Sequence, residues 1–385
     1  MSFTSQFKTR TEILERKNLS SQQYYPIAID VGYSGVKGMS PCNIFCFPSF
    51  ACKETTSMIG NPKDSDILYR DETGTYRVGE MAIDGLAIND TNNSLASLYG
   101  RNRYYSTLFK ILVRVGIAIG LGKDTNGGWD GTKPLTIQTG LPPAYRRTDT
   151  KYMIEAFSGK HSFQVKLGSG PWQHYNFYLE PKDISVMDQP LGSVLSACKR
   201  NDGTTVMLEN GKSYIDGSIL VMDGGFGTLD IYSIANRVIT DTHTYDAYGM
   251  KNVFDQTAKV INRMYGVETH AHTLAKLLDN GMVPVFDRAT RSSHEQSFAD
   301  ILKKCNEKIC LDAMTSIENT YNDLIDYEFL LVTGGTGAAW LDTIRDRYKG
   351  MSTLRIITGN QNDPTLDHIY SNVRGYYMRA VLTKK

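Results

Sequence analysis

Residues 30–37 read Asp-Val-Gly-Tyr-Ser-Gly-Val-Lys, and residues 223–230 read Asp-Gly-Gly-Phe-Gly-Thr-Leu-Asp. An apolar β-type run precedes each stretch, and a second short β-type run follows each aspartate-glycine turn. This repeated order of strand, aspartate, glycine-rich turn and strand predicts two similar β-hairpins, one in each half of the chain.

Both turns carry groups that suit a phosphate. Glycines allow positive φ and lack a Cβ, so successive backbone N–H groups can converge on a phosphate oxygen. Ser34 and Thr228 add hydroxyl donors, and Lys37 adds a positive charge. Asp30 and Asp223 suit Mg²⁺ held through water, because that ion keeps much of its hydration shell. One such turn alone is equally typical of an ordinary β-turn, but two facing turns predict a polyphosphate and its metal clamped from both sides.

A third glycine-rich stretch, Gly-Gly-Thr-Gly at residues 334–337, lies between an apolar run at 329–333 and a predicted helix at 338–348. Glycines there let the backbone lie flat against a purine or an α-phosphate, and a helix N-terminus favours negative charge. Alone, this stretch is also explained by a plain turn. The residues around Lys123 do not match the Walker motif. The loop at 334–337 does not match the dinucleotide-binding motif, because Trp340 occupies its third glycine position.

Composition excludes several classes of protein. The 42 basic and 41 acidic residues leave a net charge of +1, so no excess charge is available to hold nucleic acid or an anionic membrane. The longest apolar stretch, at 111–122, is too short to span a bilayer, and residues 1–17 lack the apolar core of a secretory signal. The six cysteines show neither a disulfide scaffold nor zinc-ligand spacing. We therefore expect a soluble, cytoplasmic protein.

Strands and helices alternate along the chain, which predicts an α/β fold with sheets covered by helices. Residues 1–23 are polar and lack a strong period, so we expect an N-terminal extension outside the first sheet. Residues 166–180 and 201–217 are expected to form added hairpins, the second around an Asn-Gly turn at 210–211.

The loops resemble those of the superfamily of actin, sugar kinases and heat-shock-chaperone ATPases. Residues 30–37 are similar to its phosphate-1 motif, 223–230 to phosphate-2 and 332–338 to its adenosine motif. Shorter matches resemble the bacterial actin-like ATPases of the ParM type, which are plasmid segregation proteins; these matches lie at residues 47–49, 139–142 and 372–376. The resemblance covers about residues 25–380.

This resemblance implies a two-lobed actin-like (ribonuclease H-like) fold, with the nucleotide in the interlobe cleft. Lobe I is expected at 24–200 plus 361–385, with a small subdomain at about 50–100, and lobe II at 201–360. The implied activity is that of an ATPase that binds ATP (GTP being the alternative) with Mg²⁺ and polymerises into filaments that hydrolysis destabilises. Members of this branch move plasmid DNA through a centromere-binding adaptor protein, so DNA is engaged only indirectly.

The resemblance also implies roles for single residues. Asp30 and Asp223 are expected to organise Mg²⁺ through water and, with Gln189, to position the attacking water. Asp188 is the rival of Gln189, and helix capping is its structural alternative. The expected nucleotide-binding residues come from the three glycine-rich loops and the start of a helix: Gly32, Tyr33, Ser34, Lys37, Gly224, Gly225, Phe226, Gly227, Thr228, Gly249, Gly334, Gly335, Thr336 and Gly337.

Two other functions of the same superfamily stay open at this stage. A small-molecule kinase would need an aspartate that deprotonates an acceptor hydroxyl, and Asp188 is the candidate. A non-polymerising, nucleotide-gated binding module would capture a partner while it stays monomeric. Acceptor-dependent ADP production would favour the first, and nucleotide-dependent capture of a partner by a permanently monomeric protein would favour the second.

Overall fold

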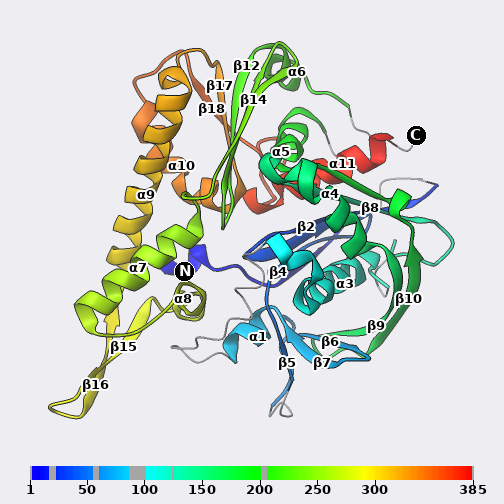
Figure 1. Cartoon of the computed structure of the whole chain (residues 1–385), viewed down its shortest axis with the longest axis horizontal. Helices are drawn as coiled ribbons and strands as arrows, with labels where there is room; N and C mark the ends of the chain where they lie inside the picture. Colours follow the sequence, from blue (N-terminus) through cyan, green and yellow to red (C-terminus); the bar gives the residue numbers. More distant parts are fainter. Residues whose placement is uncertain are drawn as a thin grey trace.

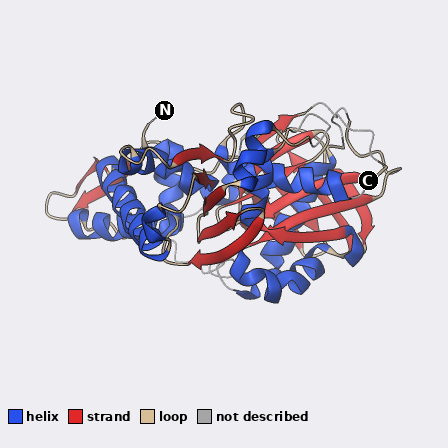
Figure 2. Ribbon diagram, turned by 90° about the horizontal axis from the view of Figure 1, so that it is seen from above, coloured by secondary structure: helices blue, strands red, loops and turns tan. Residues whose placement is uncertain are grey.

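The structure, a computed structural model, describes residues 2–16, 23–54, 60–85, 101–123, 125, 127–200 and 206–383. Figure 1 shows two lobes, each built around its own sheet, which meet along the middle of the molecule. In Figure 2 a group of helices, with a small hairpin beside it, forms one end of the molecule, and longer strands run through the other.

Lobe I contains a six-stranded sheet in the order β1 (Glu12–Glu15), β4 (Asn43–Pro48), β3 (Gly35–Met39), β2 (Tyr25–Val31), β8 (Leu135–Leu141) and β11 (Ile184–Asp188). Lobe II contains a five-stranded sheet in the order β14 (Val238–Tyr245), β13 (Leu229–Ala235), β12 (Ser218–Gly224), β17 (Phe329–Thr333) and β18 (Arg355–Thr358). In both sheets three antiparallel neighbours are followed by two parallel strands, so β4-β3-β2-β8-β11 repeats as β14-β13-β12-β17-β18. The predicted pair of hairpins is β2–β3 and β12–β13.

Two smaller sheets complete the strands. One has the order β10 (Gln173–Leu179), β9 (Gly159–Leu167), β6 (Ile67–Asp71), β7 (Gly74–Val78) and β5 (Ala51–Lys53), and lies beside the main sheet of lobe I. The other is the hairpin β15 (Met282–Asp287) and β16 (Ser292–Ser297) of lobe II.

The α-helices lie between and beside these strands. They are α1 (Glu80–Asp84), α3 (Thr107–Leu121), α4 (Pro143–Phe157), α5 (Gln189–Cys198), α6 (Glu209–Asp216), α7 (Met250–Tyr265), α8 (Ala271–Leu277), α9 (Ala299–Thr320), α10 (Gly334–Tyr348) and α11 (Ser371–Thr383).

Alternation along the first strand of each hairpin builds the core on both sides of each sheet. In β2, Ile27 and Ile29 join the cluster that contains α3, whereas Ala28 joins the cluster that contains α11. In β12, Leu220 packs with α7, α9 and α10, whereas Val221 packs with α5 and α6. Strands buried on both faces explain why β2 and β12 are apolar almost throughout.

One expectation about the N-terminal segment is wrong, because residues 12–15 form β1 at the edge of the lobe I sheet. Glu12 to Glu15 pair with Cys46 to Asn43 of β4. Among these four side chains, Ile13 packs against the core and the neighbouring Leu14 is 37% exposed. A four-residue edge strand with one inward apolar side chain is too short to show the alternation of apolar and polar residues by which a strand is recognised in a sequence.

Two further expectations are corrected. The segment at 201–217 is not a hairpin, because Asn210 and Gly211 lie inside helix α6. Gly211 is required by packing and not by a turn, since an added Cβ would overlap the carbonyl oxygen of Cys198. The hairpin expected at 166–180 is present as β9–β10. The glycines at 334–337 do not precede helix α10 but form its first turn.

No helix in the described part of the chain is long and apolar enough to cross a membrane.

Candidate functional site

A cavity of about 620 Å³ lies between the two lobes and brings the three glycine-rich loops together. Of the seventeen residues predicted for the site, fourteen line it: Asp30, Gly32, Tyr33, Ser34, Lys37, Gln189, Asp223, Gly225, Phe226, Gly227, Thr228, Gly334, Gly335 and Thr336. Gly224, Gly249 and Gly337 are outside this lining and act through packing, as described below.

The first turn is closed by backbone and side-chain bonds. The Gly32 N–H donates to the carbonyl oxygen of Gly35 at 3.2 Å, and Ser49 Oγ donates to the carbonyl oxygen of Gly32 at 2.7 Å. Asp30 pairs across the hairpin with Lys37, whose Nζ lies 3.9 Å from Asp30 Oδ2. The first turn therefore presents a carboxylate and an ammonium group side by side.

The second turn repeats these bonds with different residues. The Gly225 N–H donates to the carbonyl oxygen of Thr228 at 2.9 Å, and Thr336 Oγ1 donates to the carbonyl oxygen of Gly225 at 2.6 Å. Asp223 pairs across the hairpin with Asp230, which takes the position that Lys37 has in the first turn. The two turns are thus alike in backbone but opposite in charge at the matching cross-strand position.

Amide side chains orient the two predicted metal-binding carboxylates. Gln189 Nε2 donates to Asp30 Oδ1 at 3.0 Å, and Asn372 Nδ2 donates to Asp223 Oδ2 at 2.7 Å. Burial raises the pKa of Asp223 to about 6; the hydrogen bond from Asn372 opposes this shift and the negative charge of Asp30 adds to it. Both carboxylates are almost fully buried.

A third buried carboxylate lies behind Asp223. Burial, with the charge of Asp223 second, raises the pKa of Asp230 to about 7, although its oxygens accept bonds from Thr244 Oγ1 at 2.6 Å and Thr228 Oγ1 at 3.1 Å. Burial is the main cause of both raised pKa values, and repulsion between neighbouring carboxylates adds to each of them. A cation between the lobes would relieve that repulsion.

These residues suit Mg²⁺ bound mainly through water. Carboxylate oxygens are the ligands that Mg²⁺ prefers, and the ion retains several waters when protein supplies only one or two carboxylates. Within the described residues no group of three or more His, Cys, Asp or Glu side chains forms a complete metal site. Asp30 and Asp223 therefore remain the predicted pair, with a phosphate and water as the other ligands.

The two glycine-rich turns touch each other across the cleft. A Cβ on Gly227 would lie 2.5 Å from the ring of Tyr33, so only glycine allows this approach without displacement. The guanidinium of Arg103, which is almost fully buried, lies 4.7 Å from the centre of the Tyr33 ring. Tyr33 is therefore held between the opposite lobe and a buried cation.

Three predicted glycines outside the lining make close backbone contacts. A Cβ on Gly224 would lie 2.6 Å from the backbone nitrogen of Gly337, which brings the second turn against the start of α10. Gly249, just before α7, would meet the carbonyl oxygen of Phe226 at 2.6 Å. Gly334, which does line the cavity, has a φ of +77°, a conformation that residues with a side chain rarely adopt.

Asp188 and Gln189 are neighbours in sequence but face different surroundings. Asp188 accepts a hydrogen bond from Tyr232 Oη at 2.6 Å and pairs with Arg146 at 3.2 Å, and it does not line the cleft. Its side chain makes no capping bond to α5 either, although it occupies the N-cap position. Gln189 is therefore the residue of this pair that faces the cleft.

Sequence reasoning did not assign Asn372, Ser49 or Ser193 to the site. Asn372 is fixed by Ser193 Oγ, which donates to Asn372 Oδ1 at 2.7 Å and lies 2.7 Å from Thr333 Oγ1. The signal for Asn372 was its place in the short match at 372–376. Ser49 carried the same kind of signal, because it ends the short match at 47–49. Ser193 carried no comparable signal, because isolated serines in apolar surroundings are common.

Comparisons with known proteins agree with this architecture. Residues 28–192 match the family model "Actin like proteins N terminal domain". A solved structure described as "pCBH ParM non-polymerisable quadruple mutant" is 20% identical with a TM-score of 0.69, covering 92% of this chain and 98% of that one. A ParM from a 15-stranded filament of Clostridium botulinum is 18% identical with a TM-score of 0.66, covering 93% of this chain and 99% of the other.

An archaeal actin homologue, Ta0583, is 17% identical with a TM-score of 0.64 and covers 92% of this chain and 99% of its own. A search of curated protein sequences finds no match. The chain thus has the two-lobed actin-like fold, and its resemblance to bacterial actin-like proteins of the ParM type is confirmed.

Proposed function

We propose that this protein is an ATPase that binds ATP with Mg²⁺ between its lobes and polymerises into filaments in the cytoplasm. The observation that carries the nucleotide site is the pair of matching turns on repeated hairpins, which face one cavity together with Asp30 and Asp223. GTP is the alternative nucleotide. The limits of the lobes that we propose are those stated above from the sequence, except that residues 12–15 belong to lobe I as β1.

Different residues of the cleft bind the phosphates, offset their charge and orient the attacking water. Backbone N–H groups of both turns, with Ser34 and Thr228, donate to phosphate oxygens, and Lys37 offsets their charge. The Gln189 amide, held by Asp30, orients the attacking water. Asp30 and Asp223 would hold Mg²⁺ through water, and the ion would supply positive charge to offset the negative charge of the phosphoryl group during transfer.

Support for filament formation comes from similarity to proteins whose structures are described as filaments, including the 15-stranded ParM filament and Alp12. From the same similarity we also propose a role in plasmid segregation through a centromere-binding adaptor protein. The kinase alternative has less support, because its candidate base, Asp188, is engaged by Tyr232 and Arg146 outside the cleft lining.

Light scattering tests assembly directly. Above a critical protein concentration, scattering should rise when ATP and Mg²⁺ are added together, and negative-stain electron microscopy should show filaments. ADP with Mg²⁺, and ATP with excess chelator, are the controls and should give no sustained rise. Nucleotide binding without assembly under any of these conditions would contradict the filament proposal and favour the monomeric binding module.

A further inference from the structure

The N-terminal segment 2–15 crosses from one lobe to the other and is called the strap below. We infer that the strap fastens lobe II to lobe I beside the cleft and sets the rate at which bound nucleotide leaves. This inference rests on the proposed nucleotide binding. Figure 1 shows the strap running from the N-terminus beside α7 and α8 to the edge of the lobe I sheet.

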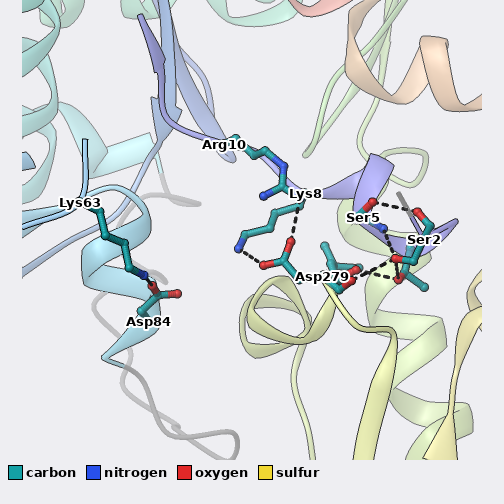
Figure 3. Close-up of polar contacts among 9 residues, drawn as sticks. Ser2, Ser5, Lys8, Arg10, Lys63, Asp84 and Asp279 are labelled. Carbon is teal, nitrogen blue, oxygen red and sulfur yellow. Dashed lines mark hydrogen bonds and ion pairs between the residues drawn. The ribbon is translucent and has the colours of Figure 1, made fainter. Parts of the chain in front are cut away.

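One end of the strap is attached to lobe II at the loop after α8. Lys8 Nζ and Arg10 Nη2 both pair with Asp279, at 2.6 and 2.7 Å. Ser2 Oγ donates to the carbonyl oxygen of Asp279 at 3.1 Å, and Thr4 Oγ1 donates to that of Leu278 at 2.6 Å. Figure 3 shows Lys8 and Arg10 converging on Asp279 from the strap.

Packing supports this first attachment. Phe7 lies against the apolar core of lobe II. A Cβ on Gly281 would lie 2.8 Å from Thr4 Oγ1, so the glycine makes room for the strap. The loop after α8 is therefore shaped to receive residues 2–8.

The other end of the strap is attached to lobe I through β1. The strand pairs with β4 over four residues, and Ile13 packs against the core of lobe I. Glu12 accepts a hydrogen bond from Tyr370 Oη at 2.8 Å, and the Arg16 N–H just beyond the strap donates to the carbonyl oxygen of Cys42 at 2.6 Å. This attachment combines backbone pairing, apolar burial and a part-buried hydrogen bond.

The chain between the attachments is short. From Lys8 to Glu12 there are four residue steps, which span at most about 14 Å when fully extended. Lobe II cannot move far from β4 unless one attachment breaks. Asp279 and Arg10 are half exposed, at 50% and 43%, whereas Lys8 is only 9% exposed. Because exposed ion pairs are weak and β1 is held by backbone pairing as well, we expect the lobe II attachment to release first.

The strap also forms part of the cleft wall. Residues 6–12 line the same cavity as Asp30, Gly227 and Thr336. Beside the strap, Lys276 Nζ of α8 donates to the carbonyl oxygen of Asp84 in α1 at 2.8 Å, a second contact between the lobes. Opening of the cleft on this side therefore requires the strap to move.

The test is the release of a fluorescent ATP analogue from the full-length protein, chased with excess ATP in a stopped-flow instrument. Asp279→Lys, and separately the double variant Lys8→Asp with Arg10→Asp, should each speed release roughly fivefold, which corresponds to the loss of exposed ion pairs. The triple variant restores opposite charges and should return release to within about twofold of the unchanged protein. Asp216→Lys, which breaks the exposed pair with Arg237, is the matched control and should leave the rate unchanged.

Equal release rates in all variants, or no recovery in the triple variant, would contradict the proposed role of the strap in nucleotide release. If the unchanged protein binds no nucleotide, the proposed function fails, and small-angle X-ray scattering of the ligand-free protein then tests the strap alone. The radius of gyration should increase in Asp279→Lys and return in the triple variant. An identical radius in all three proteins would exclude an interlobe tether.

Discussion

Asn372 in the first turn of α11 donates a hydrogen bond of 2.7 Å to Oδ2 of Asp223, at the end of β12. The same amide accepts from Ser193 at 2.7 Å, so its donor and acceptor ends are both fixed. A helix packed on the lobe I sheet thereby orients a carboxylate that belongs to the lobe II sheet. Movement of one lobe against the other must change this contact.

Replacing Asn372 with aspartate should move the pH dependence of ATP hydrolysis. A second carboxylate at hydrogen-bonding distance removes the donor to Asp223 and adds a like charge, both of which raise the pKa of metal-free Asp223 further above about 6. Protons then compete with Mg²⁺ for this carboxylate up to a higher pH. We expect the acidic limb of the pH–rate profile to shift upward by about one unit or more. Asn176→Asp, on an exposed position of β10, is the control; identical profiles for Asn372→Asp and the unchanged protein would contradict this assignment.

Replacing Gly227 with alanine should weaken nucleotide binding. The added Cβ would lie 2.5 Å from the Tyr33 ring, so the two glycine-rich turns must separate. Displacing backbone donors from phosphate oxygens should cost about 1–3 kcal/mol, or roughly fivefold to 150-fold in Kd. Isothermal titration with ATP and Mg²⁺ measures the change. Gly350→Ala, where an added Cβ meets no atom within 4 Å, should bind normally.

Replacing Asp223 with alanine should suppress hydrolysis more than nucleotide binding. The carboxylate lies at the end of β12, where its predicted task is to hold Mg²⁺ through water and not to contact the nucleotide directly. Filaments should still assemble with ATP but persist longer. Phosphate release, nucleotide affinity and filament lifetime are measured on the same preparation; equal losses of affinity and hydrolysis would mean that Asp223 is a binding residue alone.

Stability should fall in mild acid because of His161, which lies outside the cleft. Burial lowers its pKa to about 4, partly opposed by the hydrogen bond to the carbonyl oxygen of Phe157 at 2.9 Å. Between pH 6.5 and 4 the unfolded chain binds a proton that the folded chain does not, so unfolding becomes easier as pH falls. The glutamine side chain of His161→Gln does not titrate. Between pH 7 and 4.5 the free energy of unfolding of this variant should therefore fall by about 2 kcal/mol less than that of the unchanged protein. Denaturant unfolding at both pH values measures this, and equal losses would contradict the buried neutral histidine.

Local patterns in the sequence were sufficient to predict the repeated hairpins. β2 and β12 are apolar because both faces are buried, and the aspartate and glycines that end them are close together in the chain. The glycine-rich loops are predictable for the same reason. Gly211 shows the limit of such patterns, since it resembles a turn residue but is required by packing against Cys198, a contact that no local pattern contains.

Contacts between distant segments were not predictable in this way. Asn372 and Asp223 are 149 positions apart, and Lys8 and Asp279 are 271 apart. Asn372 lies in the short match at 372–376, but nothing in the sequence pairs it with Asp223 or pairs Lys8 with Asp279. These contacts follow only from the place to which the folded chain brings the four residues. β1 was missed for a related reason, because its stability comes from pairing with β4 and not from its own four residues.

The opposite charges at the matching cross-strand positions, Lys37 in one hairpin and Asp230 in the other, give the cleft a polarity that the repeated backbone does not have. Two identical halves would present the same face to either end of a ligand and could hold it in two reversed orientations of equal energy. With a cation on one side and a buried acid on the other, the two orientations differ in energy. A difference at one cross-strand position between two hairpins of the same form would thus be enough to make the cleft hold the proposed ligand in a single direction.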